Sequence, residues 1–289
     1  MRESTAVIIG ANGQLGSDLT SWWSSKGVRV VPLTHAEISV EDSDSVRAAL
    51  VSLRPDIVVN TAAFHNVPRC EEEPVRSHAV NSLGALNVAQ TGASLGAAVV
   101  YISTDYVFDG AQRRPYRETD RANPLSVYAA TKLLGEYYTL NYASRAYVIR
   151  VSGIYGRVPC RAKGGNFITT MQKAARERPE VRVVTDEILT PTPTLDIAKS
   201  LLTVVQRGEP GLYHMTCEGE CSWYDFAQVI FSTLKFTTPL VPAGVADFPS
   251  PVRRPTYSVL EKGTLRAQGL PLLPDWRDSL ITFLRQIGS

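Results

Sequence analysis

The stretch that decides the fold is AVIIGANGQLGSDLTSWWSSKG, residues 6–27. It opens with an apolar run typical of a buried strand and ends in a helical pattern that a glycine terminates. Gly10, Gly13 and Gly16 lie between the two. Glycines at such a junction allow a tight turn and let an anion approach the N–H groups at the start of the helix. The stretch therefore predicts a pyrophosphate-binding turn, and the alternative is a tight turn without a ligand.

Strand and helix patterns continue to alternate beyond this stretch. Strand-like apolar runs cover 28–33, 55–60, 97–103 and 146–152, and helical patterns cover 44–53, 74–95 and 126–141. The strands are apolar on both faces, as in a buried parallel sheet. We therefore predict an α/β fold with a doubly wound parallel sheet of the Rossmann type.

The regular alternation ends at about residue 152, where Gly/Pro-rich loops and shorter elements begin. We therefore divide the chain into a dinucleotide-binding domain, residues 1–152, and a smaller, mainly substrate-binding C-terminal domain, residues 153–289. Some segments of the second domain are expected to return to the first.

Composition excludes several classes of partner. The 289 residues are 44% apolar and 20% charged, with a formal charge of +2 and no Lys/Arg-rich run, so we expect no nucleic acid or membrane partner. The apolar stretch near the N-terminus is too short for a signal peptide, and we expect a cytoplasmic protein. Cys217 and Cys221 are spaced loosely like metal ligands, but no further His or Cys pair completes a zinc set. We expect reduced cysteines and no metal.

A hydroxyl, a phenol and an amine are expected together at the mouth of the sheet. In ISTDYVFDG, residues 102–110, the fourth expected strand ends at Ser103 and Thr104 follows it. Tyr128 and Lys132 are four residues apart in a helical pattern, so they share one helix face. Because the ligand crevice of a doubly wound sheet lies at the carboxyl ends of its strands, the three side chains predict a carbonyl-reducing site. The alternatives are a solvated Tyr–Lys pair and a Thr104 that only caps a helix or forms a turn.

Eight motifs carry a resemblance to a known family. They are GANGQLG, RPDIVVNTAAF, ISTDYVFDG, PYRETDRANPLSVYAATKLLGE, GGNF, LTPTPTLDIA, GLYHMTCEGECSWYDFA and RRPTYSVL, and they run almost from end to end of the chain. By these motifs the chain resembles the extended short-chain dehydrogenase/reductases, and more narrowly the dTDP-4-dehydrorhamnose reductases. The Thr–Tyr–Lys set is generic to the larger group, whereas STDYVFDG, GGNF and CSWYDFA are much narrower signals.

The resemblance implies roles for individual residues. Tyr128 would donate a proton, Lys132 would lower the pKa of Tyr128 and hold the nicotinamide ribose, and Thr104 would polarise the ketone. The expected cofactor-binding residues are Gly10, Asn12, Gly13, Gln14, Leu15, Gly16, Ser39, Val40, Ala62, Ala63, Phe64, Tyr128 and Lys132. The expected substrate-binding residues are Thr104, Asp105, Tyr128, Val67, Gly153, Asn166, Phe167, Arg253 and Arg254.

The resemblance also implies a reaction, the NAD(P)H-dependent reduction of the 4-keto group of dTDP-4-dehydro-6-deoxy-L-mannose to dTDP-L-rhamnose. The enzyme would be a monomer or a homodimer. Because the second expected strand ends in Thr34 and His35 and no carboxylate follows until Glu37, we expect NADPH, with NADH also accepted. Two alternatives stay open: a nucleotide-sugar epimerase or dehydratase of the same superfamily, and a non-catalytic regulatory subunit resembling the β subunit of methionine adenosyltransferase.

Two loops of the C-terminal domain suit a nucleotide diphosphate. They are RAKGGNF, residues 161–167, and SPVRRPTYSVL, residues 250–260. Their positive charge suits phosphates, and their aromatic and amide groups suit a pyrimidine base. Arg253 and Arg254 could instead form a solvated surface pair. Many relatives carry Trp where this chain has Gly153, which implies a roomier sugar pocket.

Several conspicuous side chains are expected to be structural. His65 follows the third expected strand, and a structural role is favoured over a catalytic one. Trp22 and Trp23 lie in the first expected helix, one packed on the sheet and the other on a neighbouring loop. Trp223 is expected to begin a helix of the second domain and to pack there.

Overall fold

The computed structural model describes residues 4–160 and 164–287, and a six-stranded parallel sheet forms its centre. The strands are β1 (Thr5–Ile9), β2 (Arg29–Leu33), β3 (Ile57–Asn60), β4 (Ala98–Thr104), β5 (Arg145–Val151) and β10 (Gly211–His214). Their order is β10-β5-β4-β3-β1-β2, and every neighbouring pair is parallel. Every residue of β1, β3 and β4 is buried, because helices cover both faces. The predicted doubly wound sheet is confirmed.

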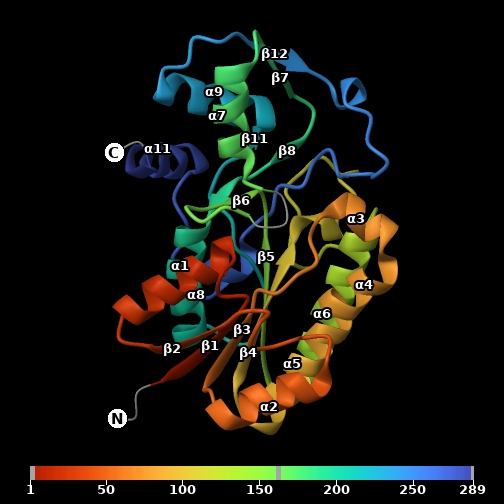
Figure 1. Cartoon of the computed structure of the whole chain (residues 1–289), viewed down its shortest axis with the longest axis vertical. Coiled ribbons are helices and arrows are strands. Elements are labelled where there is room, and N and C mark those ends of the chain that lie inside the picture. The colour runs from red at the N-terminus through yellow and green to blue at the C-terminus, as the bar shows by residue number, and fades with distance from the viewer. Residues whose placement is uncertain (1–3, 161–163, 288–289) are drawn as a thin grey trace.

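The helices form two layers around the sheet (Figure 1). The helices α1 (Gln14–Ser25) and α8 (Thr194–Arg207) pack side by side on one face, at the left of Figure 1. The other face is covered by α2 (Ser43–Leu53), α5 (Gly84–Ser94) and α6 (Val127–Tyr142). Each expected strand and helix of the first half lies within a few residues of its predicted bounds, because its apolar pattern matches the face it buries.

The two tryptophans of α1 are structural, as expected. Trp23 is fully buried, and its indole N–H donates to the backbone oxygen of Ala198 in α8 over 2.9 Å. Trp22 is partly buried on the same helix, where the ammonium groups of Lys26 and Lys199 lie 4.4 and 5.5 Å from its ring centroid. The pair therefore ties α1 to α8.

The connections that leave β1 and β3 run in opposite directions along the sheet. The one after β1 leads to β2 on one side, and the one after β3 leads to β4 on the other side. At such a switch point the two connections diverge and leave a crevice at the carboxyl ends of the strands. Gly10 follows β1 and Thr61 follows β3, so the first residues of both loops meet at this crevice.

The helix predicted over 74–95 is divided into three parts. They are α4 (Pro74–His78), the π-helix η1 (Ala79–Leu83) and α5, and the short helix α3 (Val67–Glu72) precedes them. A π-helical turn adds a residue to the helical repeat, and such turns are frequent at functional sites. Here η1 carries Asn81, which is fully buried and faces the crevice loop after β3.

A smaller lobe lies beyond the carboxyl ends of the strands, at the top of Figure 1. It contains β6 (Ile154–Tyr155), α7 (Phe167–Glu177), β7 (Val181–Val184), β8 (Ile188–Leu189), β9 (Thr192–Pro193), β11 (Cys221–Ser222), α9 (Trp223–Leu234), β12 (Leu240–Ala243), η3 (Val245–Asp247) and α11 (Trp276–Ile287). One hydrophobic core joins residues of β1 and α1 to residues of α9 and α11. The division of the chain into two domains at residue 152 stays a prediction. Two elements of the second part, β10 and α8, pack with the large sheet of the first part.

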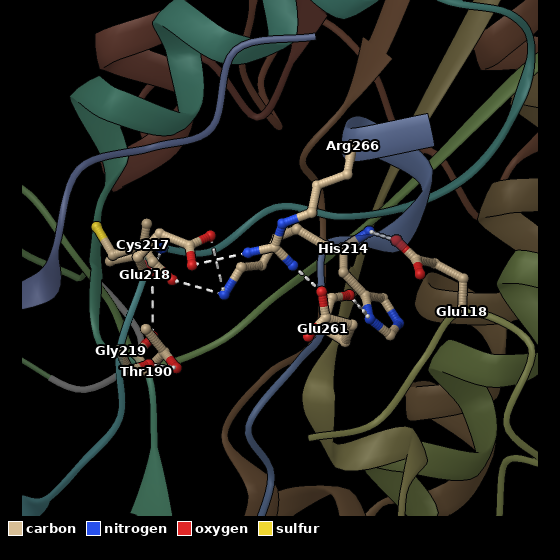
Figure 2. A network of polar contacts seen from close by, with 10 residues as sticks. Glu118, Thr190, His214, Cys217, Glu218, Gly219, Glu261 and Arg266 are labelled. Atoms are coloured by element: carbon tan, nitrogen blue, oxygen red, sulfur yellow. Dashed lines mark hydrogen bonds and ion pairs between the residues drawn. The ribbon is translucent and has the colours of Figure 1, made fainter. Parts of the chain in front are cut away.

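A polar network fastens β10 to the segments beside it (Figure 2). Arg266, in α10 (Gly263–Ala267), pairs with the carboxylates of Glu218 and Glu261. The backbone oxygen of Glu261 also lies 2.8 Å from Nδ1 of His214, at the end of β10.

A helix of the length and hydrophobicity that a bilayer crossing requires is absent from the described residues.

Candidate active site

The turn after β1 forms a cradle for an anion. Gly10 has φ +79°, and a Cβ there would lie 2.6 Å from Oγ1 of Thr61. A Cβ at Gly16 would lie 2.3 Å from the backbone oxygen of Gly10, so both positions require glycine. Gly13 is the N-cap of α1 and no side chain caps the helix, which leaves its first N–H groups for a ligand. The turn therefore suits a pyrophosphate.

A cavity of about 1450 Å³ extends from this cradle along the carboxyl ends of the strands to the smaller lobe. All but one of the predicted site residues line it: Gly10, Asn12, Gly13, Gln14, Leu15, Gly16, Val40, Ala62, Ala63, Phe64, Val67, Thr104, Asp105, Tyr128, Lys132, Gly153, Asn166, Phe167, Arg253 and Arg254. Ser39 is the exception, and its N–H donates instead to Oγ of Ser45 over 3.0 Å.

The end of the cavity next to β2 is lined by Thr34 and His35, as the sequence suggested. Glu37 is not part of the lining, because its carboxylate accepts hydrogen bonds from the N–H of Thr34 (2.7 Å) and from its hydroxyl (2.5 Å). These bonds lower the pKa of Glu37 below its usual value. Glu41 does line the cavity, so one carboxylate remains at this end.

Thr104 and Tyr128 meet in the cavity lining. Thr104 ends β4, Tyr128 lies in the first turn of α6, and their hydroxyls share a hydrogen bond. Burial raises the pKa of Tyr128 above its usual value, and the bond with Thr104 opposes this shift. Tyr128 is therefore a neutral phenol that keeps its proton. Thr104 also accepts from the N–H of Tyr106 over 3.2 Å, so the turn-forming role considered for it is present as well.

Lys132 lies one helical turn after Tyr128. Its Nζ donates to the backbone oxygen of Ile102 over 2.5 Å, and burial lowers its pKa to about 7 while Glu136 acts in the opposite direction. The resemblance implied that Lys132 lowers the pKa of Tyr128, and this role stays a prediction, because in this structure the net shift of the Tyr128 pKa is upward. The reason is that burial dominates at Tyr128, while the ammonium is engaged with Ile102.

The carboxylate of Asp105 is satisfied by the protein itself. Oδ2 accepts from the hydroxyls of Ser152 (2.7 Å) and Ser258 (2.6 Å), and Oδ1 lies 3.1 Å from Oγ1 of Thr104. Burial nevertheless raises the pKa of Asp105. Asp105 thus fixes the Thr104 hydroxyl and ties β4 to the C-terminal loop that contains Ser258.

The loop after β3 is held by a residue that the sequence did not single out. The side chain of Asn81 accepts from the N–H of Phe64 (2.8 Å) and donates to its backbone oxygen (2.9 Å). His65 lines the cavity as well, with Nδ1 3.0 Å from the backbone oxygen of Ala63 and Nε2 3.2 Å from Sγ of Cys160. The π-helical turn of η1 placed Asn81, and a uniform helical pattern gives no signal for such a turn.

Aromatic rings line the far end of the cavity. Phe167 stacks on Trp223, with ring centroids 4.5 Å apart and planes at 26°. Trp223 begins α9, as predicted, but it also lines the cavity, which the sequence did not indicate. Its indole bonds to the carboxylate of Glu187, another lining residue that sequence reasoning missed. The amide of Asn166 is already engaged, capping α7 and donating to the backbone oxygen of Gly156 over 3.1 Å.

Positive charge accompanies these rings. Arg253 and Arg254 are exposed and line the cavity. Burial raises the pKa of Glu187, and the charge of Arg254 offsets part of this increase. Two other positive residues of the predicted loops, Arg161 and Lys163, lie outside the described residues.

Gly153 does not simply leave room for a sugar. Its φ is +51°, and a Cβ there would lie 2.9 Å from Cδ1 of Leu189 and 3.1 Å from Cα of Pro191. The space that a side chain would enter is thus occupied by two residues of the smaller lobe. A larger residue at this position would require a different backbone conformation.

The comparisons with known proteins agree on one family. The family model described as RmlD substrate binding domain matches residues 4–289. The spore coat polysaccharide biosynthesis protein SpsK of Bacillus subtilis is 36% identical over 283 residues, 98% of either chain. The dTDP-4-dehydrorhamnose reductase of Mycolicibacterium smegmatis is 36% identical over 95% of this chain and 83% of its own. A crystal structure of dTDP-4-dehydrorhamnose reductase from Bacillus anthracis in complex with NADP is 31% identical, with a TM-score of 0.94, and covers 99% of this chain and 100% of its own.

Proposed function

The chain belongs to the RmlD substrate binding domain family, and from this membership and its site we propose that it reduces dTDP-4-dehydro-6-deoxy-L-mannose to dTDP-L-rhamnose with NADPH. The reaction adds a hydride and a proton to the 4-keto group. We include in the proposal a nucleotide-sugar partner and a chain that works in the cytoplasm as a monomer or homodimer.

One observation carries the proposal. The anion cradle at Gly10 to Gly16, the hydroxyl pair of Thr104 and Tyr128, and the aromatic and positive groups of the smaller lobe line one cavity. The cradle suits a dinucleotide because Gly10 and Gly16 allow the chain to fold back closely on itself in the turn, and because the start of α1 is uncapped. A nucleotide diphosphate suits the other end, where Arg253, Arg254 and the Phe167 ring lie.

Each residue of the site has its own role in the reduction. NADPH, when bound, supplies the hydride that goes to C4 of the sugar. Tyr128 donates its proton to the carbonyl oxygen, which becomes a stronger base than a phenolate as it gains negative charge, so a buried phenol of raised pKa can still protonate it. Thr104 donates a hydrogen bond to the same oxygen. Lys132 holds the nicotinamide ribose and stabilises the phenolate that Tyr128 becomes.

The assay that tests the function supplies NADPH and a 4-keto sugar nucleotide. We expect stoichiometric NADPH oxidation with dTDP-4-dehydro-6-deoxy-L-mannose and far slower oxidation with the free 4-keto sugar, because the sugar alone leaves the nucleotide end of the cavity without contacts. An epimerase or a regulatory subunit would consume no NADPH. Equal kcat/KM for the free and dTDP-linked sugars would contradict the substrate assignment.

A double variant tests the positive charge at the nucleotide end. Replacing Arg253→Ala together with Arg254→Ala should raise KM for the dTDP-sugar by about 10- to 100-fold, since each guanidinium can make charge-assisted hydrogen bonds to phosphate. NADPH affinity should change little. The matched control is Arg207→Ala with Arg285→Ala, two exposed arginines away from the cavity. An unchanged KM in the first variant would mean that both arginines are a solvated pair.

The cofactor preference is tested at the β2 end of the cavity. We expect NADPH to be used at least as well as NADH, because Thr34 and His35 carry no negative charge to repel a 2′-phosphate, and the carboxylate of Glu37 is bound to Thr34 and does not line the cavity. Discrimination should be modest, since the described segment 34–41 after β2 carries no arginine for the phosphate and Glu41 lines the cavity. The variant His35→Asp should lower kcat/KM for NADPH by about five- to tenfold through like-charge repulsion and leave NADH use almost unchanged. A strong NADH preference of the unaltered protein in parallel kinetics would refute this reading.

A further inference from the structure

Lys132 has a second partner besides the backbone oxygen of Ile102. Its Nζ lies 3.9 Å from the centroid of the Tyr101 ring, in β4, and the exposed fractions of the two residues are 2% and 1%. A cation over an aromatic face is attracted by the negative face of the ring, more strongly where water is excluded. Without such a contact, the loss of hydration of a buried ammonium is poorly compensated.

The ring of Tyr101 is itself fixed from two sides. Its hydroxyl donates to the backbone oxygen of Asn81, in the π-helix η1, over 2.8 Å. On the other side, a Cβ at Gly135 would lie 2.4 Å from the Tyr101 hydroxyl oxygen, so α6 carries glycine where the ring passes. Burial raises the pKa of Tyr101 well above its usual value, so the ring stays neutral. The ring therefore cannot turn away from Lys132 without losing its hydrogen bond.

We propose that Tyr101 is a positioning residue whose ring face holds the Lys132 ammonium, in its charged form, where it can serve Tyr128 and a bound cofactor. The inference rests on the proposed function for the role of Lys132. The placement of the ammonium over the ring is independent of that role and can be measured in protein without cofactor.

The contribution of the Tyr101 ring to the pKa of Lys132 has to be separated from that of the other charges nearby. The titratable and charged groups facing it are Tyr128 and Glu136 on α6, Tyr101 on β4 and, through Glu136, Arg150 on β5. Burial lowers the pKa of Lys132 to about 7, and Glu136 opposes this shift, although Arg150 offsets part of its charge. Loss of the ring should lower the pKa of Lys132 further, because the charged form loses an attraction that the neutral amine does not feel.

The experiment titrates Lys132 in the cofactor-free protein by NMR of ¹³C-labelled lysine, with Lys132→Met to assign the signal. In the unaltered protein the Cε protons of Lys132 should resonate upfield, since they lie by the ring face. Tyr101→Met keeps most of the volume and should lower the pKa of Lys132 by about one unit. Tyr101→Phe keeps the ring face and should keep the pKa. The control Tyr147→Met removes a similarly buried ring, of β5, whose hydroxyl donates to the backbone oxygen of Gly208 over 3.2 Å.

Binding gives a second measurement without turnover. At pH 8 the affinity of Tyr101→Met for NADPH should fall by about tenfold, the loss expected when the charged fraction of Lys132 falls tenfold. At pH 5.5 the affinities should converge, and Tyr147→Met should bind normally at both pH values. Equal titration of Lys132 in the Tyr101→Met and Tyr147→Met variants would overturn the proposal.

A Tyr101→Met protein that does not fold leaves two decisive measurements. An unshifted Cε signal in the unaltered protein, or loss of the upfield shift in Tyr101→Phe, would overturn the placement of the ammonium over the ring. If the signal and the titrations behave as expected but no 4-keto sugar nucleotide is reduced, the proposed function fails and the positioning of Lys132 by Tyr101 stands.

Discussion

Replacing Tyr128 by phenylalanine should reduce the turnover of the dTDP-sugar by about 10²- to 10⁴-fold, the usual contribution of a positioned general acid. The substitution keeps the ring and its edge-to-face packing on Tyr106, whose centroid lies 6.2 Å away. Only the hydroxyl that shares a hydrogen bond with Thr104 is removed. Steady-state kinetics with saturating NADPH would measure the loss, and NADPH binding followed by fluorescence should be nearly unchanged.

The control for this variant is Tyr116→Phe. Tyr116 is also buried, and its hydroxyl donates to Oδ1 of Asp109 over 2.8 Å, but it does not line the cavity. Its loss should therefore leave turnover close to that of the unaltered protein. If Tyr128→Phe also turned over at a near-normal rate, Tyr128 would not be the proton donor, and another acid or water would have to replace it.

The first half of the fold was predictable because its apolar patterns are strong and continuous. The runs that became β1, β3 and β4 are buried on both faces, and parallel sheets covered by helices produce this pattern. The π-helix at Ala79–Leu83 was not predictable, because the same apolar residues suit a regular α-helix. The return of β10 to the sheet depends on tertiary pairing with β5, which a four-residue run does not specify.

The candidate site was predictable where a motif also fixes its position in the fold. Gly10 follows β1, Thr104 ends β4 and Tyr128 lies in the first turn of α6, and the order of these elements brings the three residues to one crevice. Trp223 and Glu187 were missed because they reach the cavity through packing within the smaller lobe, and their spacing in the sequence carries no sign of it.

Replacing Glu136 by glutamine should lower the free energy of unfolding by about 3–5 kcal/mol, the cost of leaving one partner of a buried ion pair uncompensated. Glu136 and Arg150 are only 4% and 5% exposed, with Oε2 and Nη2 2.6 Å apart. Oε1 also accepts from Nε of Arg150 (2.8 Å) and from the hydroxyl of Ser103 (2.5 Å). His214, 3.4 Å from the guanidinium, cannot replace the lost negative charge, since its ring is neutral or positive; burial and Arg150 hold its pKa well below the usual value, so it also adds no second positive charge.

Two further variants separate the loss of a charge from the loss of packing. In Glu136→Met with Arg150→Met both charges are removed, so the double variant should be much more stable than Glu136→Gln, since apolar residues of similar size often replace a buried pair at little cost. The exposed pair of Arg69 and Glu73, i and i+4 on α3 and its C-cap, supplies the matched control. There Glu73→Gln should cost far less, because Glu73 and its partners Arg69 and Arg76 stay hydrated. Urea unfolding followed by tryptophan fluorescence measures the free energy of unfolding of the three variants. If Glu136→Gln lost no more stability than Glu73→Gln, Arg150 would have recovered its hydration. The buried pair would then not hold β4, β5 and α6 together.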